Sequence, residues 1–275
     1  MAPRKADLAG KDYWDGIWAD ARVPEPIDPG RGGIGNFANL AFHRFFTRAF
    51  ESQLTRGRKL VEVGCARSAW LPYFASEFGF VVSGIDYSQT GCVQAERALA
   101  SAGRSGRIYC ADVFDPPGEL VHTQDVVVSF GVVEHFADTA ACLSALNGLL
   151  APGGTIITVI PNLTGLLGWV EKLLDRRVYD LHMQLSAERL RSAHQEAGLH
   201  VAKCEYLMVT NWGVLNLGSW PCGPIRSRVE HQISHITRLF WLAERSQPGI
   251  IRPNRITSPY VVCVASSRGR APTNA

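Results

Sequence analysis

The chain has 275 residues, of which 46% are hydrophobic and 19% are charged, a composition typical of a globular domain. Lysine and arginine number 28 against 25 acidic residues, a net charge of +3, and no stretch carries the dense block of like charge found in nucleic-acid-binding tails. The length accommodates one large domain with additional segments at its edge. We therefore expect a globular domain with no nucleic-acid partner.

Cysteine usage and the apolar runs bear on compartment and membrane association. The seven cysteines are Cys65, Cys92, Cys110, Cys142, Cys204, Cys222 and Cys263. None forms a Cys-x-x-Cys pair and no Cys/His set has zinc-ligand spacing, so we expect neither a disulfide framework nor a metal site. Residues 1–16 contain no apolar core of a signal peptide, and prolines and glycines interrupt the apolar run 149–170. These features favour a cytoplasmic protein that does not associate with membranes.

In chain order, a helix is predicted first and then an alternation of strands and helices. The segment 36–54 has the pattern of a helix that precedes the sheet. Valine- and isoleucine-rich runs typical of buried parallel strands cover 59–65, 80–87, 106–112, 125–131 and 154–162. Helix-spaced apolar residues occupy the intervals 70–79, 88–103 and 138–154. The alternation predicts an α/β fold with right-handed crossovers.

The C-terminal part adds two helices, at 163–175 and 186–198, and two strands, at 200–209 and 259–267. Between those strands, an amphipathic stretch from Ile225 to Ala243 places apolar residues on one face. That face comprises Ile225, Val229, Ile233, Ile236 and Phe240. It either packs on the sheet edge or caps a substrate cleft, to which Trp212, Trp220 and Trp241 would add aromatic walls.

The residues that end the strands indicate the ligand, because ligands of such sheets bind at the carboxyl ends of the strands. Gly64 opens a loop that lacks both the G-x-G-x-x-G pattern of dinucleotide sites and the G-K-[ST] of a P-loop. Asp86 can accept hydrogen bonds from a ribose diol, and Asp112 from an exocyclic amino group. Glu62 adds negative charge that favours a cationic ligand. The pattern therefore indicates a nucleoside with a positive tail.

The strand ends VEVGC, GIDYS, CADVF and SFGVVEHF resemble, in order and spacing, the successive cofactor motifs of class I S-adenosylmethionine-dependent methyltransferases. The resemblance covers residues 55–200 and implies a Rossmann-like, doubly wound sheet of seven strands, mostly parallel with an antiparallel last strand and helices on both faces. It implies S-adenosylmethionine as cofactor. The implied cofactor-binding residues are Tyr13, Trp14, Glu62, Gly64, Ala66, Ser68, Asp86, Tyr87, Asp112, Val113, Ser129 and Phe130.

The chain departs from the family pattern in the loop after the first strand, and two histidines are candidates for catalysis. The family usually has G-x-G-x-G, whereas Ala66 and Ser68 stand at the second and third glycine positions, where no phosphate must approach and Ser68 can donate to the methionine carboxylate. His135 and His182 are candidate general bases for a hydroxyl acceptor. His135 is equally consistent with a structural role. Tyr13 and Trp14 either cover the sulfonium by cation–π attraction or pack on the sheet.

The acceptor is expected to be a small, partly apolar metabolite. The [DNS]-P-P-[YFW] motif of amino-methylating nucleic-acid enzymes is missing after the fourth strand, where SFGVVEHF stands. We expect a lid segment at 1–56, a catalytic domain at 57–209 and 258–268, and a substrate cap at 210–257. Methylation of a hydroxyl or amine in natural-product (antibiotic-type) biosynthesis is the favoured hypothesis. The alternatives are an RNA methyltransferase and a methyltransferase-like domain without activity.

Overall fold

We describe a computed structural model of the chain, which covers residues 7–19, 22–215, 217, 220–221, 223–247, 249 and 251–268. Cys222 lies outside the described residues. The helices are α1 (Lys11–Ala19), α2 (Phe37–Phe50), α3 (Trp70–Glu77), α4 (Gln89–Ser101), α5 (Thr139–Asn147), α6 (Leu166–Leu174), α7 (Arg176–Asp180), α8 (Ala187–Glu196) and α9 (Pro224–Ser246). Short 3-10 turns occupy Ile34–Asn36, Val133–His135 and Trp212–Val214.

Within the described residues, seven strands form one sheet in the order β3-β2-β1-β4-β5-β7-β6. They are β1 (Lys59–Val63), β2 (Val81–Asp86), β3 (Arg107–Cys110), β4 (Gln124–Phe130), β5 (Leu150–Pro161), β6 (His200–Leu207) and β7 (Tyr260–Ser266). Strands β1 to β5 pair in parallel, whereas β7 is inserted antiparallel between β5 and β6. The predicted Rossmann-like sheet with an antiparallel last strand is confirmed.

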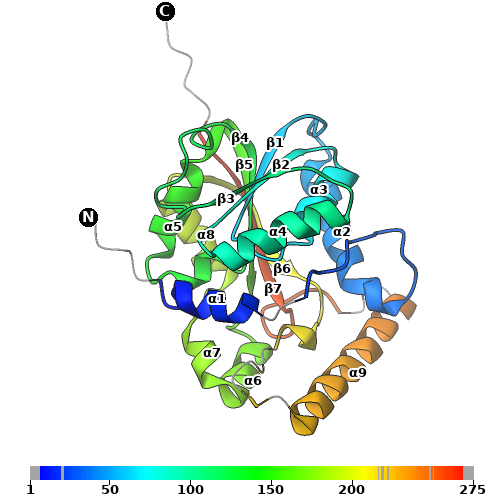
Figure 1. Cartoon of the computed structure of the whole chain (residues 1–275). Helices are drawn as coiled ribbons and strands as arrows, with labels where there is room; N and C mark the ends of the chain where they lie inside the picture. Colours follow the sequence, from blue (N-terminus) through cyan, green and yellow to red (C-terminus); the bar gives the residue numbers. More distant parts are fainter. Residues whose placement is uncertain are drawn as a thin grey trace, which may run out of the picture.

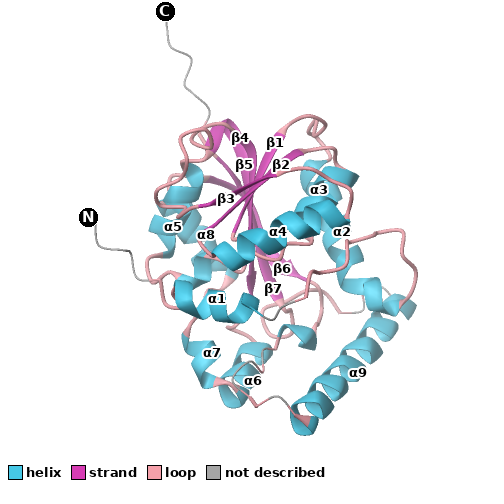
Figure 2. Ribbon diagram, viewed as in Figure 1, coloured by secondary structure: helices cyan, strands magenta, loops and turns pink. Residues whose placement is uncertain are grey.

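Helices cover both faces of the sheet, as Figure 2 shows. One core lies under α5 and α8 and includes Leu143, Leu146 and Leu190. The other lies under α2, α3 and α4, where Phe46 and Phe74 are fully buried. Helices α1, α6, α7 and α9 instead gather at one end of the sheet, at the bottom of Figure 1. This is the end at which the parallel strands terminate.

The helix predicted over 138–154 is shorter than expected. Asp138 caps α5 by accepting a hydrogen bond from Ala141 N at 2.9 Å, but the helix ends at Asn147 and residues from Leu150 onward already belong to β5. Leu150 pairs with Gln124, and the register then shifts so that Thr155 pairs with Val126. The Pro-Gly-Gly segment thus forms an irregularity within a strand rather than the end of a helix.

Helix α9 is rotated relative to the predicted apolar face, and that prediction was wrong in detail. Ile225, Ile236 and Phe240 are exposed, whereas Thr237 and Trp241 are buried. Thr237 Oγ1 accepts a hydrogen bond from Trp212 N at 3.1 Å, and Trp241 Nε1 donates to Thr210 O at 2.9 Å. These two hydrogen bonds, and not the number of apolar residues, determine the buried side.

No helix in the described part of the chain is long and apolar enough to cross a membrane.

Candidate functional site

A cavity of about 470 Å³ lies beyond the carboxyl ends of β1, β2 and β4. Its walls include acidic side chains (Asp7, Glu62, Asp86) and aromatic ones (Trp14, Trp18, Trp70, Tyr87, Phe130, Phe136). Most of the strand ends singled out in the sequence meet here, because parallel strands end at the same edge of the sheet. The size and the mixture of apolar walls with a few polar groups are typical of a small-molecule site.

The loop after β1 follows the cavity floor, and its departures from the glycine pattern have structural explanations. Gly64 has φ 74°, and a Cβ at this position would overlap the Val132 side chain, so glycine is required here. Ala66 lines the cavity, and its methyl group faces α4 at Gly91, where an added Cβ would lie 2.5 Å from it. The second loop position therefore tolerates a methyl group because a glycine in α4 provides the space.

Ser68 connects this loop to α3 and to Glu62. Its hydroxyl donates to Glu62 Oε2 at 2.6 Å and accepts hydrogen bonds from Trp70 N and Leu71 N at 2.9 and 3.2 Å. The Ser68 hydrogen is directed to Glu62 in this structure, so donation to the methionine carboxylate stays a prediction that would require this hydrogen bond to break. Burial raises the pKa of Glu62 to about 8, although the hydrogen bond from Ser68 opposes the shift.

Asp86 ends β2 and holds two backbone groups around the cavity. Its Oδ2 accepts from Ala66 N at 3.0 Å and its Oδ1 from Ser88 N at 2.8 Å. Burial raises the pKa of Asp86, and backbone hydrogen bonds from Ser88, Ala66 and Tyr87 oppose the shift. Each carboxylate oxygen has two lone pairs, so each retains one acceptor site for a ribose hydroxyl. The geometry is thus compatible with the predicted diol-binding role.

Three predicted cofactor residues do not line the cavity. Asp112 accepts a hydrogen bond from Phe114 N at 2.9 Å and thereby stabilises its own loop, although Val113 beside it does line the cavity. The Ser129 side chain is buried in the sheet. Tyr13 is not among the residues that line the cavity, whereas Trp14 and, one helical turn later, Trp18 are. The cofactor contacts predicted for Asp112, Ser129 and Tyr13 therefore stay predictions that the cavity lining does not support.

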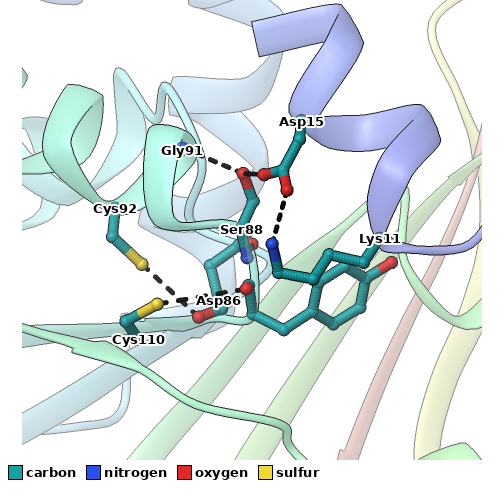
Figure 3. Close-up of polar contacts among 8 residues, drawn as sticks. Lys11, Asp15, Asp86, Ser88, Gly91, Cys92 and Cys110 are labelled. Atoms are coloured by element: carbon teal, nitrogen blue, oxygen red, sulfur yellow. Dashed lines mark hydrogen bonds and ion pairs between the residues drawn. The ribbon is translucent and has the colours of Figure 1, made fainter. Parts of the chain in front are cut away.

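The N-terminal segment is hydrogen-bonded to the loops that border the cavity. Leu8 N donates to His135 O at 2.8 Å, and the Tyr87 hydroxyl donates to Asp7 Oδ2 at 2.8 Å. In the middle of α1, Asp15 Oδ1 accepts a hydrogen bond from Ser88 Oγ at 2.6 Å, as Figure 3 shows. Ser88 directly follows the Asp86–Tyr87 pair, so this contact joins α1 to the segment that bears Asp86.

His135 and His182, the predicted catalytic pair, lie together although they come from different segments. Their ring centroids are 4.4 Å apart, and His135 lines the cavity under the edge of Trp14. Each Nδ1 lies against a backbone carbonyl oxygen, Leu181 O at 2.8 Å and Val178 O at 2.7 Å. Because a carbonyl only accepts, each Nδ1 carries the hydrogen and each Nε2 of the neutral ring keeps a free lone pair.

The buried carboxylate of Glu134 completes this cluster and was not singled out from the sequence. Neither of its oxygens has a hydrogen-bond partner among the described residues, and burial raises its pKa to about 8. Burial also lowers the pKa of His135 to about 4, with a smaller contribution from His182, whose own pKa is lowered by burial. One ligand atom from each of the three side chains lies within 4.8 Å of the other two.

The fold and the site define a nucleoside-binding α/β domain of the methyltransferase type. The chain belongs to the methyltransferase domain family, whose model matches residues 36–203. S-adenosylmethionine is the cofactor of this family. The residues present fit it, because Asp86 offers free diol acceptors and the surrounding carboxylates favour a cation.

Two curated relatives and one solved structure illustrate the similarity. The chain is 30% identical over 155 residues to the ubiquinone biosynthesis O-methyltransferase of Thiobacillus denitrificans, covering 52% of this chain and 65% of the relative. It is 31% identical over 192 residues to the chloroplastic tocopherol O-methyltransferase of Arabidopsis thaliana, covering 65% of this chain and 53% of the relative. The chain therefore spans about half to two thirds of these relatives.

The solved geranyl diphosphate C-methyltransferase of Streptomyces coelicolor, in complex with S-adenosylhomocysteine, superimposes with a TM-score of 0.60 at 15% identity. The match covers 96% of this chain and 99% of that one. At this identity the likeness establishes the fold. Both that protein and the curated relatives are named as enzymes of small molecules.

Several cavity residues were missed in the sequence. Trp18 had a detectable signal, since it lies four residues after Trp14 on a predicted aromatic segment. Trp70 begins α3 and stacks on Phe130 at 4.9 Å, and Phe136 follows His135. Asp7 had no local signal, because its place depends on the chain returning to pair with the loop after β4.

Proposed function

We propose that this protein transfers a methyl group from S-adenosylmethionine to a hydroxyl of a small, partly apolar metabolite. The observation that carries the proposal is that one cavity holds both a nucleoside-type site and a histidine. The Asp86 end offers acceptors for a nucleoside, and the His135 end offers imidazole lone pairs beneath an aromatic lid. A hydroxyl acceptor needs a base more than an amine does, so the histidines favour O-methylation.

The acceptor class is inferred from the walls and from the relatives. Trp14, Trp18, Trp70 and Phe136 present apolar surface around the histidine end. The curated relatives are named for ubiquinone and tocopherol, whose O-methyltransferases act in those pathways. We therefore propose a hydroxylated aromatic ring with an apolar substituent. Synthesis of a natural product is the proposed biological setting.

The chain contributes binding, orientation and proton transfer to this reaction. When bound, S-adenosylmethionine supplies an electrophilic methyl group on a sulfonium. Asp86 holds the ribose, and Asp7 provides negative charge near the cation. Trp14 and Trp18 exclude water from above. His135 Nε2, with His182 beside it, accepts the proton that the acceptor hydroxyl loses, because its Nδ1–H is already fixed by Leu181 O.

The segments outside the catalytic domain also have proposed roles. Within residues 1–56, the lid role falls to α1, supported by its contacts with Ser88 and with the His135 ring, whereas α2 packs in the core against the sheet. Residues 57–209 with 258–268 form the catalytic domain. The 210–257 insertion is the proposed substrate cap. Trp241 of this insertion lines a separate cleft with Asn211 and Thr237. It therefore does not form a wall of the cofactor cavity.

The test is methyl transfer from methyl-labelled S-adenosylmethionine to matched acceptors. A phenol with an apolar tail should be labelled, whereas its amine counterpart and an RNA pool should not. His135→Asn should lower kcat with a small effect on KM, whereas His43→Asn, which removes an imidazole that contacts Tyr73 outside the cavity, should leave both unchanged. Labelling of RNA would favour an RNA methyltransferase. Binding of cofactor without transfer to any acceptor would favour an inactive binding domain.

A further inference from the structure

The cluster formed by Glu134, His135 and His182 has a feature that proton transfer alone does not use. One nitrogen of each imidazole and one carboxylate oxygen lie within 4.8 Å of one another, and neither Glu134 oxygen has a hydrogen-bond partner among the described residues. Glu134 is 1% exposed. A buried carboxylate is normally hydrogen-bonded or paired with a cation, because an unpaired one is costly.

The surroundings hold the three groups in an arrangement suited to metal ligation. The 3-10 turn Val133–His135 supplies the first two ligands, and the residues after α7 supply the third. Both rings donate Nδ1–H to backbone carbonyls, which fixes the tautomer that leaves Nε2 free for a metal. Met183 N also donates to the Glu134 carbonyl oxygen at 2.6 Å, joining the segment that bears His182 to the turn.

We propose that Glu134, His135 and His182 bind one divalent transition-metal ion of the Zn²⁺ type at the edge of the cofactor cavity. Two histidines and one carboxylate form a ligand set that leaves coordination positions open. The two nitrogen ligands disfavour Mg²⁺ and Ca²⁺, which prefer oxygen. This site replaces the expectation, drawn from Cys/His spacing, that the chain holds no metal.

The open positions lie on the cavity side, because His135 and Gly131 line the cavity and Glu134 lies beneath Gly131. This part of the inference rests on the proposed function. An acceptor hydroxyl bound there loses its proton to solvent and is retained as an oxyanion, as happens to water on catalytic zinc. With the ion bound, the histidines would act through it, in place of the direct proton transfer to His135 Nε2 proposed above for the metal-free site.

The experiment is calorimetric titration of the full chain with Zn²⁺ and, separately, with Mg²⁺, followed by Co²⁺ absorption spectroscopy. We expect one tight Zn²⁺ site and no comparable Mg²⁺ site. Glu134→Gln and His182→Gln should each weaken Zn²⁺ binding about a hundredfold or more, since even partners that only orient a ligand are worth 10–100-fold. Both variants should retain affinity for S-adenosylhomocysteine, which serves as the check on folding.

The matched control uses the other histidine pair of the chain. His231 and His235 lie one turn apart on the exposed side of α9, with ring centroids 4.7 Å apart, and they can bind Zn²⁺ themselves. The double variant His231→Gln/His235→Gln should keep the tight site. Loss of binding in this double variant, or unchanged binding in Glu134→Gln, would overturn the inference. If the protein transfers methyl groups but binds no metal, the metal site is refuted and the proposed function is not. If it binds metal but transfers no methyl group, the proposed function is refuted and the metal site is not.

Discussion

The lid contact between Asp15 and Ser88 leads to a quantitative prediction about cofactor release. Ser88 Oγ is fully buried and donates to a carboxylate, and such hydrogen bonds contribute about 1.5–3 kcal/mol. Asp15 is partly exposed, so we take the lower value for the Asp15→Ala substitution. A loss of ~1.5 kcal/mol corresponds to about a tenfold increase in the open population of the lid. S-adenosylhomocysteine should therefore dissociate about ten times faster if the lid must open first.

The assay is stopped-flow displacement of bound S-adenosylhomocysteine, followed by the fluorescence of the lid residues Trp14 and Trp18. Asp12→Ala is the matched control, because Asp12 lies on the same helix and makes no hydrogen bond or ion pair among the described residues. It should leave the release rate unchanged. Equal release rates in Asp15→Ala, Asp12→Ala and the wild type would refute the view that this contact holds the lid over the cofactor.

Three further predictions concern the loop after β1 and the buried histidine of α8. Gly64→Ala should lower the free energy of unfolding by ~2 kcal/mol and abolish S-adenosylhomocysteine binding, because φ is 74° and the new methyl group overlaps Val132. A urea midpoint and an affinity close to those of the wild type would contradict this. Ser68→Ala should cost about 1 kcal/mol or more, measured by urea denaturation, because the first amides of α3 lose their cap and Glu62 loses its donor; a change below half that value would count against it. Burial lowers the pKa of His194 to about 4 from 6.5, so the folded state excludes a proton that the unfolded state binds, and stability should fall as pH drops from about 6.5 to about 4. Thermal melts should show a weaker pH dependence in His194→Asn than in the exposed control His200→Asn, and equal slopes would refute the assignment.

Much of the fold was predictable because parallel strands buried on both faces require uninterrupted apolar runs. The runs ending in Glu62-Val63, Asp86 and Phe130 identified their strands and the edge where a ligand binds. The antiparallel final strand was also expected. Strand boundaries were less accurate: β5 begins at Leu150 because pairing with Gln124 extends it past the Pro-Gly-Gly segment.

The side-chain orientations at the site could not be predicted from position alone. Asp112 has the expected place at the end of β3, but its carboxylate accepts a hydrogen bond from its own loop. The Ser68 hydroxyl already donates to Glu62 and accepts from the first turn of α3. Such nearby partners compete with any ligand. The rotation of α9 likewise depended on Thr237 and Trp241, whose hydrogen-bond partners lie far away in the sequence.

Sequence analysis selected both histidines of the pair but not their contact. His135 was selected because it follows β4, and His182 because it borders the expected acceptor region. Their contact at 4.4 Å was not predictable, since it depends on how the chain returns after α7. Glu134 was missed because an acid beside a histidine after a strand is common, and only its burial without a partner distinguishes it.

The most direct test of the account is calorimetric titration of S-adenosylhomocysteine into the wild type, Asp86→Asn and Asp125→Asn. Asp125 is the matched control, because it also accepts a backbone hydrogen bond, from Lys59 N, but lies at the start of β4, at the opposite edge of the sheet. We predict one site in the wild type and in Asp125→Asn. Affinity should fall about a hundredfold in Asp86→Asn, since two ribose hydrogen bonds of about 1.5 kcal/mol each are lost or weakened. No binding to a folded wild type, or equal affinities of the two variants, would contradict the claim that this cavity holds the methyl donor.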